Sequence, residues 1–178
     1  MGVLKRNRST ASTEYMKKGV VLYRTILYEI LKDFGTKKHI KDLKFVKEHL
    51  DEDTRAEIEK IEFIVRDKNI VMNLEYPKHF LKHIRKVFYS LLTEFMDNIT
   101  YVYSSWPTTK HEYEVRLIKT TSAISNLYTI KREYDTLYDI TKIKLGKYVS
   151  ISKMIDEEIN LLNGVRNSIR ASIKNLDG

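Results

Sequence analysis

Apolar residues recur every three or four positions along most of this chain, the spacing typical of helices that bury one face. The first such stretch covers residues 14–34, and Gly35 followed by two lysines marks its end. Its apolar stripe consists of Val20, Tyr23, Leu27, Ile30, Leu31 and Phe34. The spacing therefore predicts a first helix over 14–34 with this stripe facing a core.

Three more long stretches repeat the pattern in the second half of the chain. Pro77 suits the first position of a helix that runs to about Ser104. The next helix is predicted from about Glu112 to Gly146, and the last from about Ser150 through Ile169. Their expected core positions are Phe80, Ile84, Val87 or Phe88, Leu91 and Phe95; Leu117, Ile118, Thr121, Ile124, Tyr128, Tyr134, Leu137 and Tyr138; and Ile151, Ile155, Ile159, Leu162, Val165 and Ile169.

Residues 39–72 have a less regular pattern. A short helical stripe ends where three acids follow one another at 51–53. Thr54 with Glu57 matches a capping box, which predicts that a helix restarts there. This region is expected to form two short helices or one bent helix.

These lengths predict an all-α fold, an up-down four-helix bundle with an extra helical insertion (39–72) between the first and second main helices. Residues 1–12 are expected to be a flexible basic arm and 13–178 a single domain. The chain has no cysteine, so disulfides and thiolate chemistry are excluded. It has neither the apolar core of a signal peptide nor an apolar run of membrane-spanning length, so we expect a cytoplasmic protein without a membrane role.

The sequence favours a protein that is not an enzyme. His79 and His83 have a spacing that can hold a metal, but lysines and arginines surround them and no third ligand is nearby. The Glu-x-x-His motifs of di-iron bundles and the glycine-rich loops that bind phosphates do not occur. We therefore expect no catalytic residue, no metal and no cofactor.

Charge is the more informative property, because 32 basic residues against 24 acidic ones give a net charge of +8. The stripe Lys78, Lys82, Arg85 and Lys86 is the main candidate site for nucleic-acid phosphates. The other candidates are Lys131, Arg132, Lys5, Arg6 and Arg8. The alternative is that these cations form an ordinary solvated surface.

The second half also contains a weak motif. Lys147-Tyr148 leads to Asp156-Glu157-Glu158-Ile159-Asn160-Leu161-Leu162-Asn163-Gly164. Over residues 77–170 the chain resembles the accessory variability determinant (Avd) proteins of diversity-generating retroelements and the related four-helix proteins of ribosomal RNA intervening sequences. Asn160 replaces the family's glycine, and its tryptophan is missing. The resemblance implies a four-helix protomer, often in a five-fold barrel, whose basic surface binds nucleic acid and a reverse transcriptase, here through Lys78, Lys82, Arg85 and Lys86.

Two hypotheses follow. The first is a non-catalytic, homo-oligomeric accessory protein that holds nucleic acid by its phosphates, RNA rather than DNA, and assists a reverse transcriptase. The second is a phage- or plasmid-type adaptor or inhibitor that contacts another protein through its helix faces. The acids Asp51, Glu52, Asp53 and Glu57 beside a basic remainder favour the second hypothesis, since opposite poles suit docking or self-assembly.

Overall fold

The computed structural model describes residues 10–32, 51–67, 78–141 and 143–177, and their regular structure is entirely helical. The helices are α1 (Thr10–Leu31), α3 (Glu52–Asp67), α4 (Lys78–Ser104), α5 (Lys110–Ile140) and α6 (Leu145–Asp177). The predicted all-α class is therefore confirmed.

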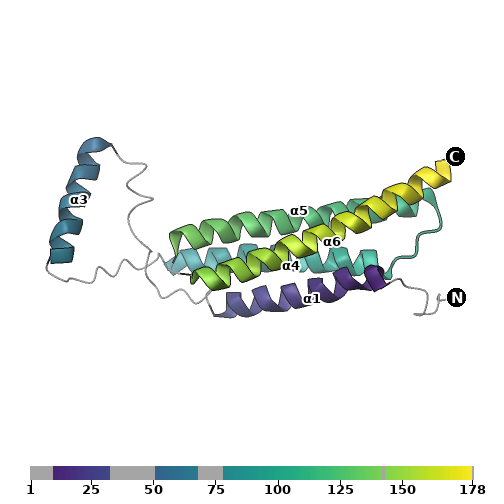
Figure 1. Cartoon of the computed structure of the whole chain (residues 1–178), viewed down its shortest axis with the longest axis horizontal. Helices are drawn as coiled ribbons and strands as arrows, with labels where there is room; N and C mark the ends of the chain where they lie inside the picture. The colour runs from purple at the N-terminus through teal and green to yellow at the C-terminus, as the bar shows by residue number, and fades with distance from the viewer. Residues whose placement is uncertain (1–9, 33–50, 68–77, 142, 178) are drawn as a thin grey trace.

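Four of these helices form an antiparallel bundle (Figure 1). Short linkers at 105–109 and 141–144 turn α4 back into α5 and α5 back into α6. Helix α1 packs against both α4 and α6, which closes the ring of four. The predicted up-down bundle with an extra helix between its first two members is what the structure shows.

Helix α3 stands apart from the bundle in Figure 1. It begins at Glu52 because Asp51 accepts hydrogen bonds from the backbone N–H of Thr54 at 2.9 Å and from its hydroxyl at 2.9 Å. An acidic side chain that caps the third backbone N–H of a helix is a strong start signal. The prediction that Thr54 caps this helix was wrong, since Thr54 lies within its first turn. The rest of 39–72 lies outside the described residues.

Three other helix boundaries differ from the prediction. Helix α1 begins at Thr10 rather than residue 14, so the end of the predicted arm is helical. Helix α5 ends at Ile140, where the Thr141 hydroxyl and backbone N–H both donate to the carbonyl of Leu137. Helix α6 begins at Leu145, which places Gly146 and Ser150 inside it. A threonine, rather than the predicted glycine, therefore ends α5.

The start of α5 is fixed by a capping box that the sequence analysis did not identify. The hydroxyl of Thr109 accepts from the N–H of Glu112, and the Glu112 carboxylate accepts from the N–H of Thr109 at 3.0 Å. The same carboxylate accepts from the N–H of Thr108 at 2.7 Å. These hydrogen bonds lower the pKa of Glu112 to about 2.

The buried stripe of α1 is rotated around the helix axis by about one residue from the predicted stripe. Tyr15, Leu22, Ile26 and Ile30 are buried, whereas Leu31 is 75% exposed. In α4 and α5 the predicted core is partly right. Of its members, Ile84, Phe88, Phe95, Ile124, Tyr134 and Leu137 are buried, whereas Ile118 and Tyr128 are exposed. In α6 the predicted Ile151, Ile155, Ile159, Leu162 and Ile169 are all buried, with Val165 packed beside them.

Candidate nucleic-acid interface

The predicted basic stripe lies at the start of α4. Lys82, Arg85 and Lys86 are exposed there, and Lys78 is the first residue of the helix. Lys5, Arg6 and Arg8 lie outside the described residues. Three neighbouring exposed cations on one helix give a positive surface without a defined shape.

Lys131 is differently placed. Its ammonium donates to both carboxylate oxygens of Asp156 on α6, at 2.6 and 2.7 Å. This ion pair joins α5 to α6 and balances the charge of Lys131. Lys131 is therefore a weaker candidate for phosphate binding than its neighbour Arg132.

Arg132 lies beside a hollow between two helices. The hollow has a volume of about 420 Å³ and brings Arg132 of α5 together with Arg166 of α6. We call it the α5–α6 groove. Its lining residues are Thr121, Ile124, Ser125, Tyr128, Thr129, Arg132 and Arg166.

The two arginines are available to a ligand. Arg132 pairs with Glu133 at 2.8 Å, but its side chain is 72% exposed, and such surface pairs contribute little. The Nε of Arg166 is buried and has no hydrogen-bond partner in the described part of the chain. Arginine presents a planar set of donors that matches the oxygens of a phosphate. An anion in the groove would therefore meet two guanidinium groups, one from each helix.

Tyr128 places an aromatic ring in the same groove. Its side chain is 56% exposed, which corrects the prediction that it belongs to the core. A ring beside two arginines can stack on an unpaired base while the arginines contact phosphate. The spacing of Thr121, Ser125, Tyr128 and Arg132 at four, three and four residues was a sequence signal for this surface.

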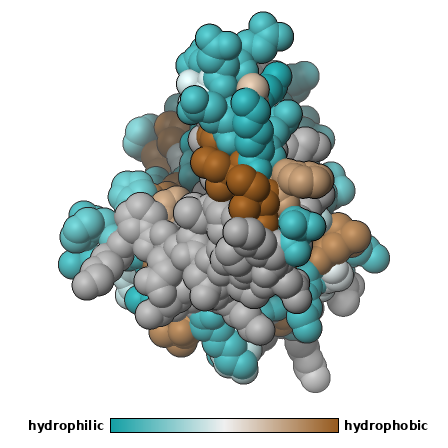
Figure 2. Space-filling view, turned by 90° about the vertical axis from the view of Figure 1, so that its left-hand side faces the viewer, coloured by the Kyte–Doolittle hydropathy of each residue, from teal (hydrophilic) through white to brown (hydrophobic). Residues whose placement is uncertain are grey.

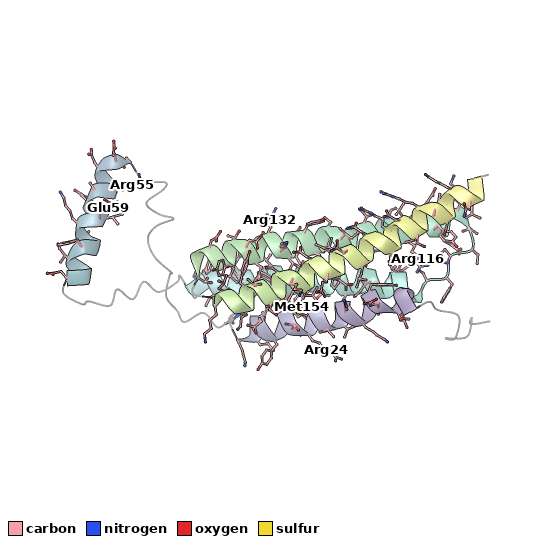
Figure 3. The ribbon with its side chains drawn as sticks, in the orientation of Figure 1. Arg24, Arg55, Glu59, Arg116, Arg132 and Met154 are labelled. Carbon is pink, nitrogen blue, oxygen red and sulfur yellow. The ribbon has the colours of Figure 1, made fainter. Side chains whose placement is uncertain are left out.

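Arg166 was not selected from the sequence. It lies on α6, the helix that follows the α5 of Arg132, and the packing of α5 against α6 brings the two together. In Figure 3 Arg132 lies on the outer side of α5, and Arg24 projects from α1 on the other side of the bundle. Arg24 is thus a natural control for charge changes in the groove.

His79 and His83 are both exposed on α4, and no cluster of three or more metal-binding side chains occurs among the residues described. Within the same ranges, no helix combines the length and the hydrophobicity needed to cross a membrane.

Comparison with known proteins identifies no relative of this chain. No family model, no curated protein and no solved structure matches the chain. The resemblance to the Avd proteins therefore stays a prediction.

Proposed function

We propose that this protein is a non-catalytic nucleic-acid-binding bundle that grips the phosphate backbone through the α5–α6 groove. The observation that carries the proposal is the meeting of Arg132 and Arg166, from two helices, in one hollow with the exposed ring of Tyr128. The stripe of Lys82, Arg85 and Lys86 would extend the contact or steer the strand toward it. Assistance to a reverse transcriptase would be the biological setting that the resemblance implies.

The charge distribution supports this proposal. Residues 51–67 contain seven acids and three basic residues, so the positive excess of the chain lies outside α3. Each phosphate that a cation neutralises releases a counterion, which makes such binding fall steeply with salt. A single-stranded ligand fits best, because an exposed tyrosine can stack only on a base that is not paired. We therefore propose a single-stranded nucleic acid as the preferred ligand, and RNA rather than DNA because the resemblance implies a reverse-transcriptase setting.

The test is a comparison of two double variants that change charge equally. We expect Arg132→Glu/Arg166→Glu to lower the affinity for a single-stranded RNA at least tenfold. The slope of log affinity against log salt should also fall by about two, as two phosphate contacts are lost. The measurement is fluorescence anisotropy of labelled RNA, DNA and duplex at about 50–200 mM salt.

Arg24→Glu/Lys153→Glu is the matched control, since both residues are exposed, Arg24 on α1 and Lys153 on α6. It changes the net charge by the same amount and should leave more of the binding intact. A third variant, Lys82→Glu/Arg85→Glu, measures the share of the α4 stripe. Equal losses in the groove variant and the control would show that only overall charge matters and would overturn the groove.

A second candidate function is protein contact through α3. Ile61, Phe63 and Ile64 are 51%, 72% and 49% exposed, beside the acids of that helix. Figure 2 shows this hydrophobic surface below the hydrophilic top of α3. The acidic, partly apolar helix would complement the basic bundle of a second copy.

This candidate makes its own prediction about assembly. If α3 joins two copies, Phe63→Ser should convert an oligomer into a monomer, measured by light scattering at low and high salt. Helicity should not change, because Phe63 is exposed. Tyr89→Ser, at an exposed aromatic residue of α4, is the control. A wild-type protein that is monomeric at every concentration would exclude self-assembly through α3.

A further inference from the structure

An arginine occupies a core position at one end of the bundle. The inner face of α5 is a row spaced alternately by three and four residues: Tyr113, Arg116, Thr120, Ala123, Leu127, Ile130, Tyr134 and Leu137. Every member from Thr120 onward is completely buried. Arg116 continues this row one turn before Thr120, so its side chain is directed to the bundle interior where α5 begins.

A hollow of about 380 Å³ lies beside Arg116. Its walls come from α1, α5 and α6, near the end of the bundle where α6 finishes (Figure 3). The described residues that line it are Tyr15, Tyr113, Arg116, Asn160, Leu161, Gly164, Val165, Ser168, Ile169 and Ser172. A Cβ added at Gly164 would have no atom within 4 Å, so the space in front of this residue is open.

The charge of Arg116 has no counterpart in this hollow. Its Nε–H is buried and donates to no acceptor among the described residues, and none of the described lining residues is acidic. The acid one turn earlier, Glu112, uses its carboxylate to cap α5. A partly buried guanidinium without an acceptor is costly, which makes the hollow favourable for an anion.

We infer that this hollow binds a small organic oxyanion, a carboxylate or a phosphate monoester that carries an apolar or aromatic group. Arg116 would hold the oxyanion through its planar donors. Asn160 and Ser168 offer further polar contacts, and Leu161, Val165 and Ile169 would cover the apolar part. The volume is within the range of about 300–1,000 Å³ that small-molecule sites occupy. None of these residues lines the α5–α6 groove, so the inference does not rest on nucleic-acid binding.

Two variants test the site from different sides. Arg116→Gln removes the charge, and Gly164→Leu fills the open space. The second change should not weaken the fold, because nothing stands within 4 Å of the new Cβ and leucine favours a helix more than glycine does. Arg170→Gln removes one charge from an exposed position of α6, the helix that contains Gly164, and serves as the control.

The probes are phenyl phosphate, benzoate and the neutral benzyl alcohol, with binding measured by calorimetry and ligand-observed NMR. We expect one or both anions to bind the wild-type protein and the Arg170→Gln control, with affinity at least tenfold lower in Arg116→Gln and Gly164→Leu. Benzyl alcohol should bind more weakly than either anion. The tighter of the two anions assigns the site to phosphates or to carboxylates. Absence of wild-type binding at millimolar probe, or full binding by Arg116→Gln, would overturn the inference.

Discussion

Replacing Glu158 by glutamine should stabilise the folded protein by about 3 kcal/mol at pH 7. Glu158 lies on α6 with 1% of its surface exposed, and neither carboxylate oxygen has a hydrogen-bond partner among the described residues. It faces α1 at Gly19, where a Cβ would lie 3.2 Å from its Oε1 and 2.6 Å from Cδ1 of Ile99. A buried carboxyl group without donors strongly disfavours its ionised form.

The direction of the pH dependence follows from this burial. Desolvation raises the pKa of Glu158 to about 8; the nearby Lys18 lowers it, and Glu14 raises it further. The folded state therefore holds a proton that the unfolded chain releases near pH 4.5. The contribution of Glu158 to the free energy of unfolding is therefore fully present below pH 4.5. It is lost as the pH rises to about 8, by an amount on the order of 5 kcal/mol.

The measurement is urea unfolding of the wild-type protein and the Glu158→Gln variant between about pH 5 and pH 9. The difference between the two should grow with pH and then level off near pH 8. Glu112 does not disturb this window, because its pKa is lowered to about 2 and its effect appears only in acid. Glu157→Gln is the control, since this neighbouring side chain is 45% exposed and pairs with the equally exposed Lys18. Parallel pH profiles for the wild type and Glu158→Gln would contradict the buried-carboxyl account.

The buried face of a helix could be predicted from the sequence where apolar residues follow a single stripe. It could not be predicted where apolar residues occur on several sides of the helix. The isoleucines of α6 stand on a single stripe between charged residues, so their burial followed directly from spacing. Helix α1 contains Val20, Val21, Leu22 and Tyr23 in succession, and two neighbouring stripes fit equally well. What decides between them is Gly19, whose missing side chain lets α1 approach Ile99 and Glu158. That is a property of the packed bundle.

The candidate nucleic-acid interface was predictable only where it lies on one helix. The cations of α4 and Arg132 are visible as local runs of charge. The partner of Arg132 in the groove, Arg166, belongs to another helix, and its selection required the packing of α5 on α6. Polar residues at core spacings were the signal that was overlooked, since Arg116 and Glu158 both occupy inner positions without a partner among the described residues.

Replacing Lys147 by methionine should destabilise the protein by about 2–3 kcal/mol, because the change leaves a buried carboxylate without its cation. Lys147 in the first turns of α6 forms an ion pair with Glu29 near the end of α1, 118 residues away in sequence. The Glu29 side chain is 11% exposed and that of Lys147 33%. Partial exposure of the lysine reduces the expected loss below the 3–5 kcal/mol typical of fully buried pairs.

A double variant decides whether the loss of stability comes from the unpaired carboxylate of Glu29 or from lost packing of Lys147. Adding Glu29→Gln to Lys147→Met removes that charge, so the double variant should regain most of the stability, measured by urea unfolding at pH 7. Lys18→Met is the comparison, because it breaks the exposed pair with Glu157 and should destabilise the protein far less than Lys147→Met does. A double variant as unstable as Lys147→Met alone would mean that the aliphatic stem of Lys147, rather than its charge, holds α6 against α1. Recovery would instead show that the charge of Lys147, rather than its packing, holds α6 against α1 at Glu29.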